Sequence, residues 1–180
     1  MTSCQVFAWV SLGSNHDRHF QISRALDELA KRFGVLTLSA VYETQPVGIK
    51  VKECAPFYNL VAGFHTSLSP GELNRVFKMI EGDAKYLMPE DKSIYVRALD
   101  LDLVTHGDKS GVIEGVELPY RQLFKHDFVL LPLAELVPDE LAPGTSRTYA
   151  QLWQEHAHPE QQMQRVDFTW QKRQISLASN

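Results

Sequence analysis

The sequence predicts an α+β fold of the ferredoxin-like type, a βαββαβ unit whose antiparallel sheet carries helices on one face, followed by C-terminal additions. Two segments of helical periodicity alternate with four segments of strand periodicity in the order strand, helix, strand, strand, helix, strand. The 180 residues are 44% apolar, which is enough for a core without disulfide bonds or a structural metal. Only two cysteines are present, so a disulfide scaffold and a cysteine-rich zinc site are excluded.

The first half of the unit consists of a strand, a helix and a second strand. Gln5 to Leu12 mixes aromatic, β-branched and small residues, which predicts a buried strand that enters a turn at Gly13. From Ile22 to Phe33 apolar residues recur at helical spacings, and Gly34 ends this helix. The period changes to two from Val35 to Thr44, which predicts a second strand with Leu36, Leu38, Ala40 and Tyr42 on one side.

The second half repeats this pattern. Phe57 to His65 predicts the third strand. Ser69-Pro70-Gly71-Glu72 is a capping-box signature with proline at the first helical position, and an apolar stripe of helical spacing follows it. The fourth strand, Ala98 to Thr105, alternates leucines with Asp100 and Asp102.

Two long segments and a tail complete the chain. Gln45 to Pro56 and Gly82 to Val96 lack periodicity and are long enough to be functional loops, the second of them a candidate lid. Phe128 to Leu136 predicts a short apolar helix. We divide the chain into an α+β domain over residues 1–147 and a C-terminal extension over residues 148–180, which is weakly patterned apart from a helical turn or two near Tyr149.

Composition also limits the partners. The net charge is −4 and no basic cluster is present, so a nucleic-acid partner is not expected, whereas a small anionic ligand is compatible with the sequence. No apolar run approaches the length of about 18 residues that a membrane span needs, and the N-terminus does not resemble a secretory signal. We expect a cytoplasmic protein without a membrane partner, present as a monomer or a weak homodimer.

The acidic pair of the fourth strand is the sharpest chemical feature. Residues i and i+2 of a strand project from one face with Cα atoms about 6.6 Å apart, so Asp100 and Asp102 repel each other unless a cation lies between them. Mg²⁺ characteristically uses one or two carboxylates together with substrate phosphates, which favours a metal site. A solvated outer face of the sheet is the alternative. Glu81 is either a further carboxylate near this site or an ordinary surface glutamate.

Two further patterns suit a flat heteroaromatic ligand or an anion. Phe57 and Asn59 share one strand face and offer an aromatic surface for stacking and an amide for hydrogen bonding. The alternative is that Phe57 belongs to the core and Asn59 to a turn. The segment Ser11 to Asn15 offers backbone amides to an anion, although it lacks the Gly-Lys-Ser/Thr end of a phosphate loop.

Taken together, these segments resemble the 6-hydroxymethyl-7,8-dihydropterin pyrophosphokinases, folate-pathway enzymes that transfer pyrophosphate from ATP to a pterin alcohol. The resemblance covers roughly Val6 to Pro138 and is most specific in the run Arg97-Ala98-Leu99-Asp100-Leu101-Asp102. The ferredoxin-like fold of that family agrees with the order of elements above. The other matching segments are Ser11 to Asn15, Tyr42 to Gly48, Phe57 to Asn59, Ile80-Glu81, Pro119 and Phe128 to Leu133.

The resemblance implies a role for each matching residue. Asp100 and Asp102 would hold two Mg²⁺ ions that bridge the ATP phosphates and the attacking hydroxyl, and Arg97 would be the third catalytic residue, binding the triphosphate. The pterin would be held at its edge and stacked on both faces by Thr44, Val47, Asn59, Phe57 and Phe128. ATP, the co-substrate, would contact Arg97, Lys85, Lys125, His126 and Tyr120.

The sequence departs from the family on the ATP side. The family usually has several arginines and a tryptophan in the loop between the second helix and the Arg-x-Leu-Asp-Leu-Asp run. In this chain that loop, Gly82 to Val96, has Lys85 and Lys92 and neither of those residue types. Tyr120 stands where the family usually has histidine, and His126 where it usually has arginine. Three functions are therefore weighed: Mg²⁺-dependent pyrophosphate transfer from ATP to the pterin, a divergent pterin-binding paralogue with weak or altered transfer, and a ferredoxin-like interaction module without catalysis.

Overall fold

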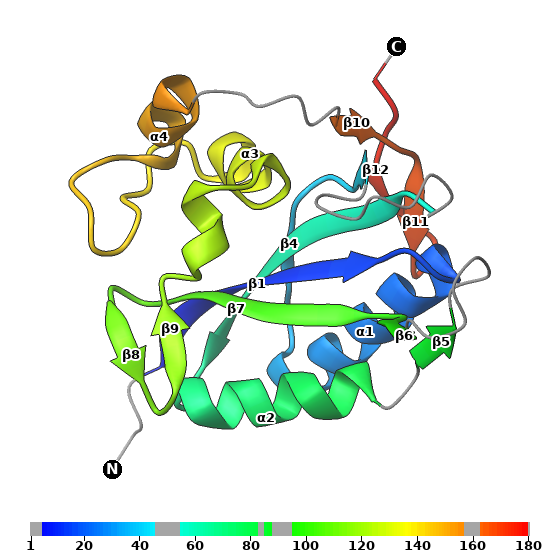
Figure 1. Ribbon diagram of the computed structural model, residues 1–180, viewed down its shortest axis with the longest axis horizontal. Coiled ribbons are helices and arrows are strands. Elements are labelled where there is room, and N and C mark those ends of the chain that lie inside the picture. Colours follow the sequence, from blue (N-terminus) through cyan, green and yellow to red (C-terminus); the bar gives the residue numbers. More distant parts are fainter. Residues whose placement is uncertain (1–4, 46–54, 83–84, 88–94, 157–162, 180) are drawn as a thin grey trace.

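A six-stranded antiparallel sheet forms the centre of the molecule (Figure 1). The computed structural model describes residues 5–45, 55–82, 85–87, 95–156 and 163–179, with the backbone alone described for 85–87 and 95–97. The sheet consists of β1 (Val6–Ser14), β2 (Thr37–Leu38), β3 (Tyr42–Thr44), β4 (Phe57–Thr66), β7 (Asp100–His106) and β10 (Met163–Arg165). Its strands follow the order β10-β3-β4-β1-β7, and β2 also pairs with β4.

Helices cover both faces of this sheet. They are α1 (Arg18–Phe33), α2 (Pro70–Glu81), α3 (Asp127–Leu136) and α4 (Tyr149–Glu155), and a 3₁₀ turn, η1 (Arg121–Phe124), precedes α3. The helices α1 and α2 of the βαββαβ unit lie on one face, as predicted, and the later helices α3 and α4 pack against the opposite face. The predicted fold class is therefore confirmed.

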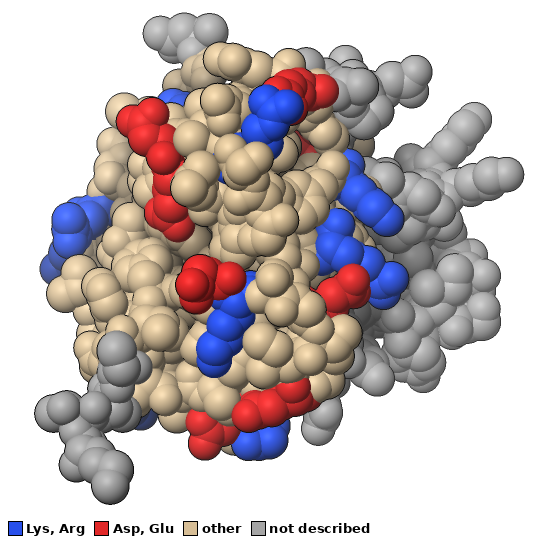
Figure 2. Space-filling view, turned by 90° about the vertical axis from the view of Figure 1, so that its left-hand side faces the viewer, with Lys and Arg blue, Asp and Glu red and all other residues tan. Residues whose placement is uncertain are grey.

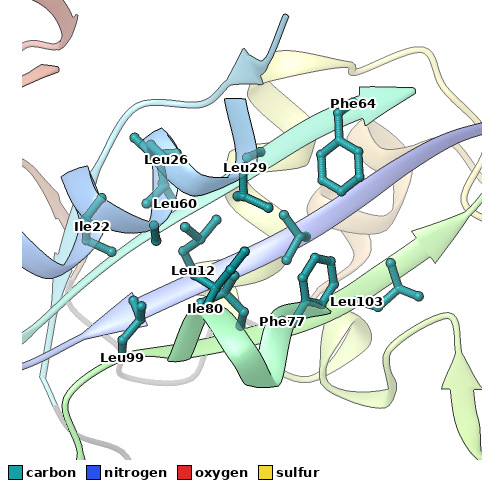
Figure 3. Packing of buried hydrophobic residues seen from close by; sticks show 14 of the residues in the cluster. Leu12, Ile22, Leu26, Leu29, Leu60, Phe64, Phe77, Ile80, Leu99 and Leu103 are labelled. Atoms are coloured by element: carbon teal, nitrogen blue, oxygen red, sulfur yellow. The ribbon is translucent and has the colours of Figure 1, made fainter. Parts of the chain in front are cut away.

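The larger core lies between the sheet and the first two helices (Figure 3). Every second residue of the central strands points into it, for example Leu12 of β1 and Leu60 of β4, both fully buried. The apolar stripe of α1 and that of α2 pack onto these residues through Leu26 and Phe77. Fully burying one such side chain contributes about 1.5–3 kcal/mol relative to leaving it exposed.

The smaller core lies on the opposite face, under α3. Trp9 of β1, Val61 of β4 and Val104 of β7 are buried there against α3, and the fully buried Tyr149 of α4 belongs to the same cluster. This cluster covers only part of the sheet face. The remaining part of that face is not packed against the apolar residues of the cluster.

The predicted single strand from Val35 to Thr44 is wrong in detail, because the structure divides it into β2 and β3. Ser39, between the two, is buried; its hydroxyl accepts a hydrogen bond from the amide of Val61, and its own amide donates to the Val61 carbonyl. Val41 is fully buried although strict alternation placed it on the polar side. The hydroxyl of Ser39 thus replaces a backbone partner where the chain leaves the regular ladder.

Short hairpins also occur where no periodicity was found. The predicted loop Gly82 to Val96 contains β5 (Lys85–Leu87), which pairs with β6 (Tyr95–Arg97). A second hairpin follows β7 and consists of β8 (Gly111–Ile113) and β9 (Val116–Leu118). Strands of three residues are too short for a period to be recognised in the sequence.

The tail contains the predicted helix α4 and three unpredicted strands. One of them, β10, adds to the sheet edge beside β3, and the other two, β11 (Phe168–Trp170) and β12 (Arg173–Ser176), form a hairpin against α1. The buried ring of Phe168 stacks on His19 at 4.3 Å, and Trp170 Nε1 donates to Asp27 Oδ1 at 2.9 Å. The tail is therefore part of the folded structure over its described residues.

The surface charges are mixed on the face shown in Figure 2. Where that face is drawn in colour, basic and acidic side chains alternate over short distances, so the net charge is not concentrated there. In the part of the chain that the structure describes, every helix is too short or too polar to cross a membrane.

The β8–β9 hairpin supplies a carboxylate to the start of α2. Glu114 Oε2 accepts hydrogen bonds from the Ser69 hydroxyl at 2.6 Å and from the Gly71 amide at 2.9 Å, and these bonds lower the pKa of Glu114. A negative charge at a helix N-terminus is also favoured by the helix dipole. Ser69 and Glu72 form the predicted capping box.

Replacing Glu114 by alanine is expected to lower Tm by about 1–3 °C at neutral pH. A depressed carboxyl pKa stabilises the folded state above the unfolded-state value, and this contribution is lost as pH falls through the folded-state pKa. The difference in Tm between wild type and Glu114→Ala should accordingly be constant above about pH 5 and shrink in more acidic buffer. Differential scanning fluorimetry across this range measures it, and a difference that grows on acidification would contradict the assignment.

Candidate active site

One face of the sheet changes from apolar to polar along three neighbouring strands. Trp9, Val61 and Val104 pack under α3 in the smaller core. Side chains two residues apart share a strand face, so the polar half of this face can be read directly from the strand registers. It consists of Ser11 and Gly13 of β1, Asn59 and Phe57 of β4, and Asp102 and Asp100 of β7.

A transverse row of paired residues crosses this polar half. Gly13 is paired with Asp100 on one side and with Asn59 on the other. Asn59 is paired in turn with Tyr42 of β3, and Tyr42 with Arg165 of β10. Neighbouring strands lie about 4.8 Å apart, so the Cα atoms of Asp100 and Asn59 are about 10 Å apart. The glycine between them adds no side chain, which leaves room between the carboxylate and the amide.

The amide of Asn59 is buried and oriented by a neighbour. Its Nδ2 donates to Thr44 Oγ1 at 2.8 Å, and the two residues are 4% and 2% exposed. Because Nδ2 is held by Thr44, the other end of the amide, Oδ1, faces Gly13. A Cβ added at Gly13 would lie 3.1 Å from this oxygen. Asn59 is therefore a strand residue and not the turn residue of the alternative interpretation.

Gly13→Ala is expected to weaken binding of a ligand held by Asn59 by about ten-fold, because displacing an oriented group by a fraction of an ångström is costly in a positioned site. Isothermal titration with a pterin alcohol measures the affinity, and thermal melting of the same sample shows whether the fold is retained. Unchanged affinity would show that the space above Gly13 is not used by the ligand.

The acidic pair lies at the edge of the sheet, on the same face as Asn59. Asp100 is 54% exposed, and its Oδ1 lies 3.9 Å from Nζ of Lys78. Asp102 is half-buried and is hydrogen-bonded by the hydroxyl of Tyr120. Burial, together with the charge of Asp102, raises the pKa of Tyr120, so this phenol stays protonated and donates to the carboxylate.

The donor set of this pair suits Mg²⁺ held jointly by protein and substrate. Two carboxylates separated by one residue share a face, and one of them is exposed enough to accept an ion from solution. Among the described residues no third histidine, cysteine or carboxylate completes a protein cage. Mg²⁺ bound through one or two carboxylates keeps its remaining positions for water and phosphate oxygens, and Asp100 and Asp102 fit that arrangement.

Glu81 is a buried residue close to the acidic pair and not an ordinary surface glutamate. It is 2% exposed, and its Oε1 accepts hydrogen bonds from the Leu101 amide at 2.9 Å and from Lys78 Nζ at 2.7 Å. The side chain thus joins the end of α2 to the backbone of β7 between the two aspartates. The prediction of an exposed glutamate is wrong, and its observed role is to hold the strand that carries the acidic pair.

The segment Ser11 to Asn15 does not form the predicted anion-binding turn. Its first four residues lie within β1, and the backbone is paired with β4 through Ser14. The Ser14 hydroxyl donates to the carbonyl of Ala98 at 2.5 Å, which joins the end of β1 to the segment before β7. This serine therefore has a structural role next to the row that contains Gly13.

The first turn of α3 carries the aromatic residue expected to stack on the ligand. Phe128 is half-buried, and its ring stacks on His126 with centroids 5.1 Å apart. Burial lowers the pKa of His126, so this ring is uncharged at neutral pH. Phe57 is half-buried and, among the described residues, belongs to neither core cluster. The interpretation of Phe57 as a core residue is therefore not supported.

Several residues expected at the site are described only in part. Val47 lies outside the described residues. For Lys85 and Arg97 only the backbone is described, and the two residues are paired in the β5–β6 hairpin. Lys125 is exposed at the end of η1, next to His126.

A hydrogen-bonded group of side chains from β3, α3 and β10 lies next to Asn59, and the sequence pattern did not identify it. Tyr42 of β3 donates its hydroxyl to Glu135 Oε2 of α3, and Arg165 of β10 donates to the same carboxylate at 2.5 Å. Burial and the bond to Glu135 raise the pKa of Tyr42 to about 12. No local signal joins residues so far apart in the chain; only the position of Tyr42 in the matching segment Tyr42 to Gly48 pointed to this region.

Comparison with known proteins identifies one family. The family model described as 7,8-dihydro-6-hydroxymethylpterin-pyrophosphokinase (HPPK) matches residues 9–138. The chain is 35% identical over 134 residues to 2-amino-4-hydroxy-6-hydroxymethyldihydropteridine pyrophosphokinase of Porphyromonas gingivalis. The matched segment covers 72% of this chain and 90% of that one. The protein of the same name from Bacillus subtilis is 30% identical over 142 residues, 77% of this chain and 83% of that one.

Solved structures agree on the fold. The crystal structure of wild-type Plasmodium falciparum HPPK-DHPS superimposes with a TM-score of 0.68 at 14% identity, covering 97% of this chain and 50% of that one. This chain therefore spans about half the length of that structure, and the likeness concerns the fold alone.

The sheet order and the helix arrangement place the chain among α+β proteins of the ferredoxin-like class, here with polar residues and an acidic pair on one sheet face. Within that class, the chain belongs to the 7,8-dihydro-6-hydroxymethylpterin-pyrophosphokinase family.

Proposed function

We propose that this chain transfers the β,γ-diphosphate of ATP to the hydroxymethyl group of 6-hydroxymethyl-7,8-dihydropterin, as a step of folate biosynthesis. The observation that carries this proposal is the transverse row, in which Asp100, Gly13 and Asn59 lie side by side on one sheet face. An acidic pair suited to Mg²⁺-bound phosphates and an amide suited to a pterin edge are thereby held about 10 Å apart, within reach of one joined pair of substrates. Family membership supports the same reaction.

In the proposed reaction, the pterin hydroxyl oxygen forms a bond to the β-phosphorus while the bond to the α,β-bridging oxygen breaks. AMP leaves, and the hydroxyl proton is released to solvent. Two Mg²⁺ ions would supply the neutralisation of the phosphate charge that otherwise makes this attack slow. Asp100 and Asp102 would hold these ions, the Tyr120 hydroxyl orients Asp102, and most of the rate would come from positioning and charge rather than covalent catalysis.

The two substrates use different parts of the site. Asn59 and Thr44 form the hydrogen-bonding edge for the pterin, together with Val47, while Phe57 and Phe128 provide stacking surfaces. Arg97 binds the triphosphate. Further contacts to ATP come from Lys85, Lys125, His126 and Tyr120.

The direct test incubates the purified chain with ATP, MgCl₂ and the reduced pterin alcohol, and separates the products by liquid chromatography. Formation of AMP and pterin diphosphate in equal amounts supports the proposal. ADP with pterin monophosphate, or no product at saturating substrate, would overturn it. Omitting the pterin is the matched control, because AMP formed without it would reveal simple ATP hydrolysis.

A second candidate function is supported by the nucleotide side of the site. His126 is uncharged at neutral pH where the family usually has a permanently charged arginine, and Tyr120 is bonded to Asp102 where the family usually has histidine. Both changes favour a divergent paralogue that binds the pterin but transfers pyrophosphate weakly or to another alcohol. Titration with a nonhydrolysable ATP analogue and Mg²⁺ distinguishes the two, since the paralogue would bind the pterin normally and the nucleotide much more weakly.

A further inference from the structure

The helix α3 is bound at both of its ends by basic side chains that come from residues 148–179. At its first residue, Asp127 Oδ1 lies 2.7 Å from Nε2 of His156, which follows α4. Near its last turn, Glu135 Oε2 lies 2.5 Å from Nη2 of Arg165 in β10. We refer to these two contacts, one from an imidazole and one from a guanidinium to a carboxylate, as the end contacts of α3.

The first end contact is almost fully enclosed. The side chains of Asp127 and His156 are 6% and 13% exposed, and the His156 ring stacks on Trp153 with centroids 6.2 Å apart. The imidazole and the carboxylate are in direct contact in a part of the structure that excludes most solvent, and this contact holds the start of the helix to the end of α4. Phe128 is the next residue along the helix, so its position depends on where the helix begins.

The second end contact is joined to the row that contains Asn59. Arg165 also donates from Nε to the Tyr42 hydroxyl at 3.3 Å, and Tyr42 itself donates to Glu135. Tyr42 is the partner of Asn59 in the register of β3 and β4, and Arg165 is the partner of Tyr42 in that of β10 and β3. One guanidinium therefore links the helix above the site to the strands that form its floor.

We propose that the described residues of the tail, 148–156 and 163–179, complete the pterin half of the site, with His156 and Arg165 as positioning residues that set the separation between Phe128 on α3 and Asn59 on the sheet. This inference rests on the proposed function. His156 and Arg165 then act on substrate recognition through α3 and β3. The acidic pair lies on β7, at the opposite edge of the sheet from β10, and neither end contact includes a residue of β7.

The test compares the steady-state constants of Arg165→Ala and His156→Ala with those of the wild type. Each variant is expected to raise KM for the pterin alcohol about three- to thirty-fold. KM for ATP should change less than about two-fold in Arg165→Ala; His156 pairs with the residue that follows His126, so KM for ATP is compared in Arg165→Ala only. Arg165→Lys keeps the charge and should recover most of the lost affinity. A matched control is Arg147→Ala. Arg147 directly precedes the tail, and its Nη1 lies 2.5 Å from Glu155 Oε1 of the tail in a half-exposed pair that does not involve α3.

A purely structural role would give a different result, namely a lower active fraction and Tm with unchanged KM for the pterin. Equal increases in both KM values in Arg165→Ala would also overturn the inference. A second readout is independent of catalysis: hydrogen exchange at the amides of α3 should be faster in both variants than in wild type and in Arg147→Ala. Unchanged exchange would refute the role of the end contacts even if the wild-type chain made no product, whereas absence of product from the wild type refutes only the proposed reaction.

Discussion

Asp102→Asn is expected to reduce kcat by a factor of about 10²–10³. The replacement is isosteric, so the hydrogen bond from Tyr120 can be kept, and what is removed is one negative charge of the acidic pair. A neutral amide binds Mg²⁺ more weakly than a carboxylate, and the phosphates of ATP then lose part of the charge neutralisation on which the transfer depends. Binding of the pterin alone should stay within two-fold of wild type, because Asp102 lies two strands away from Asn59.

Two measurements make this prediction specific. The first is the dependence of the rate on Mg²⁺ concentration, which should shift to higher concentrations in Asp102→Asn if the residue holds the ion. The second uses Asp108→Asn as the control, since Asp108 is an exposed acid just after β7 and away from the row. If Asp102→Asn turns over like the control, the metal assignment is wrong.

The acidic pair could be predicted from the sequence because its signal is local. Strand alternation alone places Asp100 and Asp102 on one face, and the leucines between and beside them identify the buried face. What could not be predicted is which residues of other strands lie beside the pair. The partnership of Asp100 with Gly13, and of Gly13 with Asn59, depends on two registers that are set by contacts across the whole sheet.

The elements that sequence reasoning missed share one physical property, which is that tertiary contacts stabilise them. The strand β10 has only three residues, Met163–Arg165, and exists because an edge strand, β3, offers unpaired backbone groups. Arg165 and Glu135 are 30 residues apart, and His156 and Asp127 also meet only after folding. No spacing within the sequence carries such information. Conversely, α2 has its predicted capping box, because capping is decided by four consecutive residues.

The amide of Asn59 provides the second large expected effect. Asn59→Ala should weaken binding of the pterin alcohol about 10- to 100-fold, which corresponds to the roughly 1–3 kcal/mol lost when a buried polar partner is left without its hydrogen bond. The side chain is 4% exposed and donates to Thr44 Oγ1 at 2.8 Å, so its removal also leaves Thr44 without that donor. The dissociation constant for an ATP analogue with Mg²⁺ should change less than two-fold.

Titration calorimetry well below Tm separates this loss from unfolding, because the same sample can be melted afterwards. Thr44→Ser is the matched control, since it keeps a hydroxyl that can accept from Asn59 Nδ2 and should bind the pterin within about three-fold of wild type. If Asn59→Ala weakened nucleotide and pterin binding equally, the proposal that the two substrates use different parts of this sheet face would be wrong. In that case the residue would support the strand arrangement as a whole, since Asn59 lies between β1 and β3 in the sheet order.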